Sequence, residues 1–407
     1  MKLVIAEKPS VAMALASVLG ARTRKDGYVE GNGYIVSWCV GHLVGLCDAS
    51  EYDEKYKKWR YEDLPIVPEC WKHKILEGTK KQFGSLKKLM RDSKVDEVIC
   101  ATDAGREGEL IFRLVYEQAG CRKPMKRLWI SSMEEQAIKD GFSSLKDGSC
   151  YDSLYQSALC RAKADWLVGI NASRLFSVLY NQNLKVGRVQ TPTLAMIVDR
   201  NQKIKEFTKE KYYMAHITFD DMDAVTEHFQ KKEDADKVAA DCAERMCEVE
   251  KDDVKEKTVR PPKLYDLTTL QREANRMFGY TAQQTLDAVQ EMYEQKLVTY
   301  PRTDSQYLTD EMGESTETLI QMLLGKMPYA EGLEYQPDVS KVLNSKKVSD
   351  HHAIIPTVEV AKADIGELKE RNCKILYLIS ARVLTATADP YICLLYTSDA
   401  ADDRISV

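Results

Sequence analysis

Two stretches decide the fold of this sequence: KLVIAEKP at residues 2–9 and EVICATDAGREGE at residues 97–109. In each, a short apolar run typical of a β-strand ends just before an acidic residue, Glu7 or Asp103, and a helical pattern follows. Strands that alternate with helices predict an α/β sheet with parallel strands. Ligands of such sheets bind beyond the carboxyl ends of the strands, where both acidic residues are expected to lie.

The same alternation extends outward from these stretches. Pro9 and Gly20 frame the first helix, since proline favours the first helical turn and glycine the position after the last. The chain then turns mainly helical, becomes acidic with mixed periodicity, and breaks at two adjacent prolines. We predict strands at residues 3–6, 34–39, 97–101, 127–130 and 297–300, and helices at residues 80–90, 110–118, 268–278 and 281–294, with a mainly helical stretch at 151–205.

The predicted fold class is a multidomain α/β protein with a parallel α/β domain followed by mainly helical domains. Two helices and a short strand after the prolines resemble a helix-turn-helix unit, which often binds DNA. This unit carries Tyr300. The predicted division is 1–150 for the sheet domain, 151–210 for a helical DNA-binding segment, 211–262 for an acidic segment, 263–393 for the tyrosine-bearing unit, and 394–407 for a terminal tail.

Composition limits the function classes. The 407 residues are 44% apolar and 30% charged, enough for two or three packed domains of ~150 residues each. The net charge of −5 hides two basic stretches, 71–94 and 161–205, each with eight Lys or Arg against two acidic residues, and an acidic stretch at 220–253. Such charged stretches are usually solvent-exposed faces. The two basic stretches are candidates for nucleic-acid contacts only if sequence motifs also point to nucleic acid.

The apolar runs and the cysteines indicate the cellular compartment. Apolar runs are far shorter than the roughly 20 residues of a membrane span, and charges interrupt the N-terminal run before a signal-peptide core could form. The eleven cysteines form no C-x-x-C pair, so no zinc ribbon is expected in this chain. We therefore expect a cytoplasmic protein with no membrane contact. Nothing indicates its oligomeric state.

Three carboxylates lie close together in the second opening stretch. Asp103 follows a predicted strand, and Glu107 and Glu109 head the next helix, while Gly105 permits a tight turn. Mg²⁺ is held by one or two carboxylates with waters and substrate phosphates, so this spacing suits phosphoryl transfer. Alternatively, the acidic residues only stabilise the helix dipole.

A second candidate is VTYPRTDS at residues 298–305. Pro301 favours an extended Tyr300, and Arg302 projects to the same side, where it could hold a phosphate. A phenol with a pKa of ~10 needs a cation or base to act as a nucleophile. The alternative is a half-buried tyrosine that only packs.

Two more polar clusters lie at residues 187–193 and 350–357. Each contains a glycine or proline of the kind found at helix ends, and side chains that can donate hydrogen bonds to phosphate. The adjacent His351 and His352 point to opposite faces of an extended chain, so contact of a histidine with phosphate is favoured over zinc. No G-x-x-x-x-G-K-[ST] loop occurs, so ATP hydrolysis is not indicated.

Taken in order, these motifs resemble bacterial type IA DNA topoisomerases, and among them topoisomerase III, over residues 1 to about 392. The strings that carry the resemblance are Glu7-Lys8-Pro9-Ser10, residues 40–42, 101–109, 165–171 and 187–190, Tyr300 to Ser305, and His351 to Thr357. It implies an N-terminal Toprim domain and single-strand DNA cleavage through a 5′-phosphotyrosyl intermediate, followed by strand passage and religation.

The resemblance also implies roles for single residues. Tyr300 would be the nucleophile, Glu7 would move the proton, Lys8 and Arg302 would neutralise phosphate charge, and His351 would steady the phosphate. Metal ligands for Mg²⁺ would be Asp103, Glu107 and Glu109. Contacts with single-stranded or underwound DNA would come from Lys185, Arg188, Gln190, Thr303, Asp304, Ser305 and His352.

Two departures from the family pattern stand out. Gly105 replaces a family carboxylate, which predicts weaker Mg²⁺ binding or a contribution from Glu109. Residues 394–407 resemble translated sequencing-adapter DNA, so we expect a truncated record with a foreign tail. Two alternatives to the topoisomerase remain open: a fragment that binds single-stranded DNA without turnover, and another Toprim enzyme such as a primase or nuclease.

Overall fold

A computed structural model describes the chain except for residues 132, 220–221, 244–248, 334–335, 349–350 and 401–407. The chain divides into two units. Unit 1 comprises Met1–Pro192 and Pro262–Ala388, and unit 2 comprises Thr193–Pro261 and Asp389–Val407. The finer division into five segments remains a prediction.

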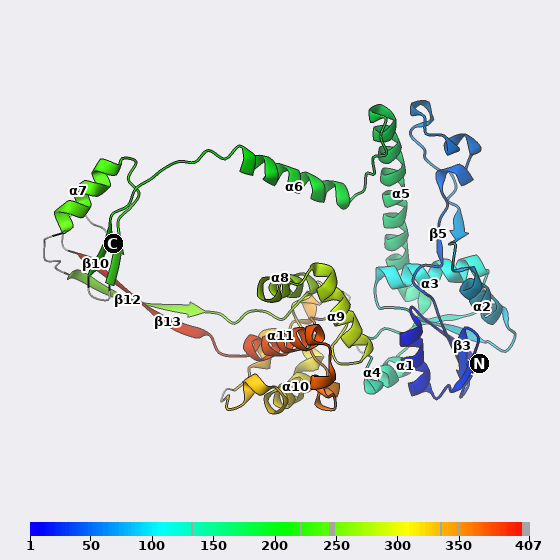
Figure 1. The fold of residues 1–407 in the computed structure, drawn as a ribbon. Helices are drawn as coiled ribbons and strands as arrows, with labels where there is room; N and C mark the ends of the chain where they lie inside the picture. Colours follow the sequence, from blue (N-terminus) through cyan, green and yellow to red (C-terminus); the bar gives the residue numbers. More distant parts are fainter. Residues whose placement is uncertain (132, 220–221, 244–248, 334–335, 349–350, 401–407) are drawn as a thin grey trace. The chain divides into compact units, whose positions relative to one another are not determined.

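A seven-stranded sheet forms the N-terminal part of unit 1 (Figure 1), with the order β2-β3-β4-β1-β7-β8-β9. The central strand β1 runs parallel to β4 and β7, and β7 runs parallel to β8, which confirms the parallel α/β sheet. The strands are β1 (Lys2–Ala6), β2 (Thr23–Lys25), β3 (Tyr28–Gly31), β4 (Tyr34–Trp38), β7 (Glu97–Ala101), β8 (Met125–Arg127) and β9 (Lys146–Asp147). A separate two-stranded antiparallel sheet pairs β5 (Val44–Leu46) with β6 (His73–Ile75).

Helices cover both faces of this sheet because alternate residues of β1 enter different cores. Leu3 and Ile5 join an apolar cluster with α2 and α3, whereas Val4 and Ala6 join a second cluster with α1 and α4. The second cluster continues into the tyrosine-bearing helices. The helices of this part are α1 (Pro9–Leu19), α2 (Lys80–Arg91), α3 (Arg106–Ala119), α4 (Glu135–Ser143) and α5 (Asp152–Tyr180).

Four helices form the tyrosine-bearing part of unit 1: α8 (Leu267–Phe278), α9 (Ala282–Glu294), α10 (Gly313–Lys326) and α11 (Glu370–Ala386). The first two lie where the sequence predicts them, and Thr281 caps α9 with Gln284 in a capping box. Apolar side chains of α8 and α9 belong to the cluster that also contains Val4. The helices therefore place the loop after α9 beside the sheet.

The predicted strand at residues 297–300 is wrong. Those residues run extended, but Val298 forms only an isolated bridge with Pro356. The amide of Thr299 donates to the carbonyl of Ile355, and there the ladder stops. Proline has no N–H, so Pro301 cannot continue the pairing, and the amides of Leu297 and Tyr300 donate instead to the carbonyls of Met292 and Ser131.

Two other predicted boundaries shift. The strand predicted at residues 127–130 is β8, which ends at Arg127 because its partner β7 ends at Ala101. The helical stretch 151–205 is two helices, since Asn181 takes a left-handed conformation with φ 49° that ends α5, and α6 (Gln190–Lys205) begins later.

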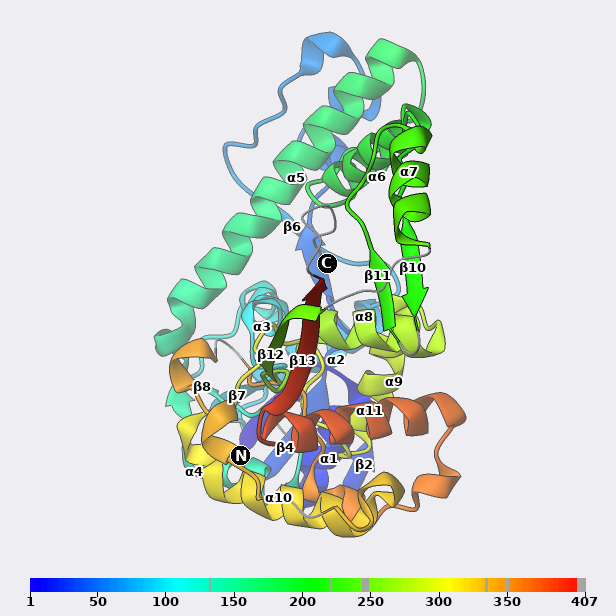
Figure 2. The ribbon, with the colours of Figure 1, turned by 90° about the vertical axis from the view of Figure 1, so that its left-hand side faces the viewer.

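Unit 2 combines two antiparallel strand pairs with helix α7 and most of α6, which confirms the mixed periodicity seen in the sequence. β10 (His216–Phe219) pairs with β11 (Met222–Val225), and α7 (Lys232–Cys242) follows. In Figure 2, β12 (Val249–Val259) runs antiparallel to β13 (Tyr391–Ala400). The predicted foreign tail thus lies partly in β13 and partly outside the described residues, and its origin stays a prediction.

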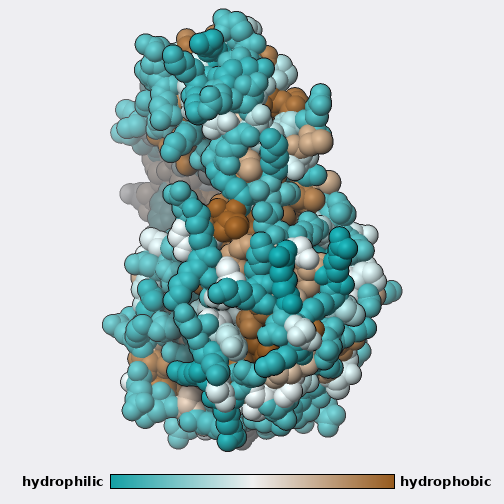
Figure 3. Space-filling model, turned by 90° about the vertical axis from the view of Figure 1, so that its right-hand side faces the viewer, coloured by the Kyte–Doolittle hydropathy of each residue, from teal (hydrophilic) through white to brown (hydrophobic). Residues whose placement is uncertain are grey.

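Among helices of the described residues, none is long and apolar enough to cross a bilayer. The face in Figure 3 is mainly hydrophilic, with small separate hydrophobic patches.

Candidate active site

A cavity of about 520 Å³ lies where β1 and β7 end. Residues from the sheet and from the tyrosine-bearing part of unit 1 line it together. The sequence-predicted residues among them are Glu7, Lys8, Asp103, Glu107, Tyr300, Arg302, Thr303, Asp304 and His351. Most of the site expected from separate motifs is therefore assembled around one space.

Tyr300 and the strand-end carboxylates are joined by hydrogen bonds. The Tyr300 hydroxyl donates to Oδ2 of Asp103 at 3.0 Å, although 197 positions separate the two residues in the sequence. The backbone amide of Asp103 donates to Oε2 of Glu7 at 3.2 Å. The Tyr300 ring packs edge-on against Tyr293, with centroids 5.4 Å apart. The phenol is thus held at the acidic end of the sheet.

Burial favours the neutral forms of the three acidic side chains Glu7, Asp103 and Tyr300. Burial, and then the charge of Asp103, raises the pKa of Glu7 to about 7. Burial also raises the pKa of Asp103. The pKa of Tyr300 lies well above its ordinary value, because of burial first and the two nearby carboxylates second. The phenol is therefore protonated at neutral pH, and the cluster favours a positive group.

Replacing Glu7 by glutamine is expected to remove a pH dependence of stability. The carboxyl has a pKa of about 7 in the folded chain and 4.5 as its ordinary value. The folded state therefore holds the proton more tightly, and the stabilisation present below pH 4.5 is lost as pH rises through 7. At about 1.4 kcal/mol per pKa unit, the loss is at most about 3.5 kcal/mol.

Urea unfolding of the metal-free wild type and the Glu7→Gln variant between pH 4 and 8 measures this loss. The difference between the two proteins reports Glu7 together with its interaction with Asp103, because groups that do not interact with Glu7 shift both proteins alike. A difference that stays constant across the range contradicts the expectation.

Cationic side chains flank the phenol. Nζ of Lys8 lies 3.7 Å from Oε1 of Glu294, the last residue of α9. Arg302 and Arg161 also line the cavity. Guanidinium groups bind phosphate through a planar fork, and an ammonium acts as a point charge. These three cations can therefore neutralise an anionic substrate.

His351 lies directly under the tyrosine ring, with centroids 4.2 Å apart. Its Nδ1 is 3.2 Å from the hydroxyl of Ser131, and its Nε2 is buried without a hydrogen-bond partner among the described residues. Burial, and then His352, lowers the pKa of His351 to about 4. The ring is therefore neutral at physiological pH.

Asp103 and Glu107 fit a hard divalent cation. Glu107 is half exposed, and its Oε1 lies 2.7 Å from Nε2 of His42, whose hydrogen bond lowers the pKa of Glu107. Across the part of the chain that the structure describes, no three His, Cys, Asp or Glu residues converge as a ready-made metal site. Two carboxylates suit Mg²⁺, which keeps several waters. The raised pKa of Asp103 shows that a nearby cation would be favoured.

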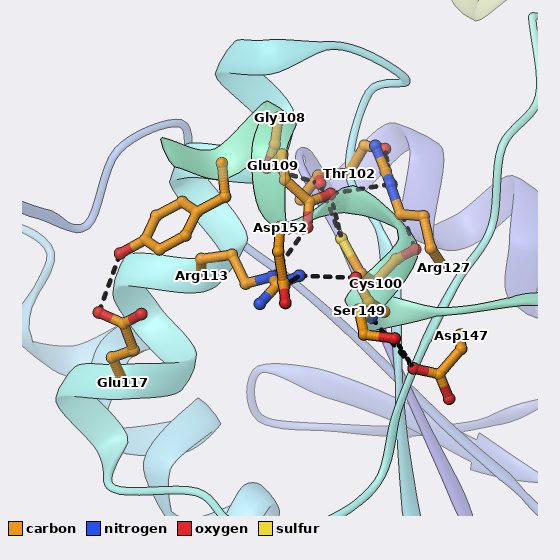
Figure 4. Close-up of polar contacts among 12 residues, drawn as sticks. Cys100, Thr102, Gly108, Glu109, Arg113, Glu117, Arg127, Asp147, Ser149 and Asp152 are labelled. Carbon is orange, nitrogen blue, oxygen red and sulfur yellow. Dashed lines mark hydrogen bonds and ion pairs between the residues drawn. The ribbon is translucent and has the colours of Figure 1, made fainter. Parts of the chain in front are cut away.

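Glu109 is placed elsewhere, and its predicted contribution to the metal site is corrected. Figure 4 shows its carboxylate between two arginines. Oε1 lies 2.8 Å from Nε of Arg113, and Oε2 lies 3.1 Å from Nε of Arg127. The side chain is 1% exposed. The helical turn that directs Glu107 to the cavity directs Glu109 into the core.

Two predicted DNA contacts are also buried in the protein. The Ser305 hydroxyl donates to the carbonyl of Lys347 at 3.0 Å, and Nδ1 of His352 lies 2.8 Å from the carbonyl of Ala353. Neither residue lines the cavity. Thr303 does line it, but its hydroxyl donates to the carbonyl of His351 at 2.9 Å. Ser305 and His352 are thus loop-forming residues rather than surface contacts.

The other predicted DNA contacts lie in the segment after α5 and at the first residue of α6, apart from the cavity lining. Lys185 and Gln190 are exposed. Nε of Arg188 lies 2.5 Å from Oδ1 of Asp165. These side chains remain accessible to a nucleic acid that extends beyond the cavity.

Three contact residues were missed in the sequence. Ser131 and Glu294 carry no local signal, since each acts on a residue far away in the chain. His42 belongs to a segment that supports the family resemblance, and that segment was the only available hint of its place beside Glu107.

Comparison with known families defines the class of protein. Residues 2–133 match the Toprim domain, and residues 149–401 match the family described as DNA topoisomerase. The second match covers more than half of the chain, so this chain belongs to the DNA topoisomerase family. The predicted Toprim domain is thereby confirmed.

Individual relatives show which members of the DNA topoisomerase family this chain is similar to. The chain is 44% identical over 409 residues to the protein named DNA topoisomerase 3 of Shouchella clausii (strain KSM-K16), covering 94% of this chain and 54% of that protein. It is 42% identical over 400 residues to DNA topoisomerase 3 of Staphylococcus epidermidis, covering 96% and 56%. The predicted resemblance to topoisomerase III is confirmed, and the chain spans about half the length of these relatives.

A solved structure supports the fold. The structure of full-length topoisomerase I from Thermotoga maritima aligns with a TM-score of 0.70 at 23% identity, covering 100% of this chain and 66% of that chain. The arrangement of sheet and helices is therefore that of a known topoisomerase.

Proposed function

We propose that this chain carries the cleavage site of a type IA, topoisomerase III-like enzyme, which cuts one DNA strand, passes a strand and religates. The observation that carries the proposal is the Tyr300 hydroxyl on Asp103 in a cavity lined by Lys8 and Arg302. A buried phenol beside acids and cations suits nucleophilic attack on a phosphodiester.

The proposed step exchanges one phosphodiester for another. The Tyr300 hydroxyl passes its proton to Asp103, to which it is hydrogen-bonded, as its oxygen attacks phosphorus. The bond to the 3′ oxygen breaks, and a 5′-phosphotyrosyl bond forms. Glu7, with a pKa of about 7, holds a proton that it can give to the leaving 3′ oxygen. Lys8, Arg302 and His351 stabilise the developing charge. The bond energy is retained, so religation needs no ATP.

Mg²⁺ would be held by Asp103 and Glu107, and it would supply positive charge next to the phosphate. Gly105 contributes no carboxylate here, so the affinity rests on these two residues. Glu7 then stays with proton transfer, since its pKa favours the neutral form below pH 7.

The substrate would be single-stranded or underwound DNA in the cytoplasm. Lys185, Arg188 and Gln190 would contact the strand beyond the cavity. Contacts of this kind are mostly with phosphates, so binding should weaken steeply with salt.

Incubation with single-stranded DNA labelled at one end tests the proposal. A 3′-end label should move into a denaturant-stable protein adduct in the presence of Mg²⁺, whereas a 5′-end label should be released, because the tyrosine retains the 5′ phosphate. Binding without any adduct would indicate the DNA-binding fragment. Free cleaved ends without an adduct would indicate a nuclease.

A further inference from the structure

Ser131 joins the sheet to both reactive groups of the tyrosine-bearing part. It lies four residues after β8 ends, at the carboxyl edge of the sheet. Its backbone carbonyl accepts the amide proton of Tyr300 at 3.3 Å. Its hydroxyl lies 3.2 Å from Nδ1 of His351. No step proposed so far uses this residue.

The carbonyl and the hydroxyl of Ser131 restrict different parts of the site. The carbonyl holds the main chain at the nucleophile, and the hydroxyl holds the imidazole ring. A neutral imidazole has one donor and one acceptor nitrogen, and the partner of one nitrogen decides the state of the other. Since Ser131 engages Nδ1, the nitrogen left for a ligand is Nε2, which is buried and has no partner among the described residues.

We propose that Ser131 is a positioning residue for DNA cleavage. Its hydroxyl donates to Nδ1 of His351, so the proton of the neutral ring stays on Nε2, and Nε2 donates to a phosphate oxygen. Phosphate oxygens only accept hydrogen bonds, so the other tautomer would present a lone pair to them. This inference rests on the proposed function, because the ligand of Nε2 is the DNA phosphate.

The Ser131→Ala variant isolates the hydroxyl, because the carbonyl contact with Tyr300 remains. We expect the rate of adduct formation to fall about tenfold, as for loss of one hydrogen bond, with affinity for single-stranded DNA within twofold of wild type. Ser131→Thr, which restores a hydroxyl, should recover most of the rate. Ser85→Ala is the matched control, since that hydroxyl bonds only the carbonyl of Lys81 on α2.

A second readout works without DNA. The chain has six histidines, so ¹⁵N NMR of histidine-labelled protein, assigned with His351→Gln, reports the tautomer of His351. Wild type and Ser131→Thr should show the proton on Nε2, and Ser131→Ala should show a mixture of both tautomers.

The outcomes separate this proposal from the proposed function. An identical His351 signal in wild type and Ser131→Ala, or a wild-type proton on Nδ1, overturns the positioning role whatever the activity. The expected NMR change together with no adduct from wild-type protein overturns the cleavage function, and with it the use of His351 in that step.

Discussion

Replacing Tyr300 by phenylalanine is expected to abolish the covalent DNA adduct, lowering its rate of formation by at least about 10⁴-fold, as for loss of a catalytic nucleophile. The variant lacks the oxygen that would bond to phosphorus. It keeps the ring that packs on Tyr293 and His351. Only the hydrogen bond to Asp103 is lost, which costs about 1–3 kcal/mol of stability.

The measurement is electrophoresis of end-labelled single-stranded DNA after denaturation, with binding measured separately by a fluorescence titration. Binding by the variant should stay within about threefold of wild type. Tyr307→Phe is the matched control, because that tyrosine lies on the same loop and its hydroxyl contacts Lys347 rather than the carboxylates. An adduct of undiminished yield from the Tyr300 variant would assign the nucleophile to another residue.

Replacing Glu109 by glutamine is expected to lower the free energy of unfolding by about 3–5 kcal/mol. The carboxylate is the counter-ion of Arg127, which is fully buried, and of Arg113, which is 11% exposed. Arg127 also donates to the backbone carbonyls of Thr102 and Asp103 at 2.7 Å each. Removing the negative charge leaves a buried guanidinium without compensation beneath the chain at Thr102 and Asp103.

Urea unfolding of the metal-free protein measures this loss. The surface pair of Glu135 with Lys139 provides the control: its carboxylate is 66% exposed, so Glu135→Gln should leave the free energy of unfolding nearly unchanged. Unchanged stability together with a loss of the Mg²⁺ requirement in the adduct assay would return Glu109 to the metal site.

The parts of the fold that sequence alone predicted are those set by neighbours along the chain. The cap of α9 depends on Thr281 and Gln284, three residues apart, and the end of α1 depends on Gly20, which takes φ 76°. The strands β1 and β7 depend on apolar runs. The strand predicted before Pro301 failed because the amide of Tyr300 donates to the carbonyl of Ser131, a distant residue that no local pattern shows.

The candidate site was likewise predictable from sequence only in part. The motifs supplied the residue types, but contacts such as Tyr300 with Asp103 depend on packing between segments 197 positions apart. Glu109 was misplaced because spacing at a helix start does not say which way a side chain faces. Arg113, four residues later on the same helix, was a readable sign of an ion pair.

The apolar cluster that runs from Val4 on β1 to Val289 on α9 has a thermodynamic consequence. Any motion that draws Tyr300 and helix α9 away from the carboxylates must hydrate part of this cluster. Hydration of apolar surface increases the heat capacity. The free energy of separating the tyrosine-bearing helices from the sheet should therefore depend on temperature along a curve. The state in which they are in contact should become less stable on cooling as well as on strong heating.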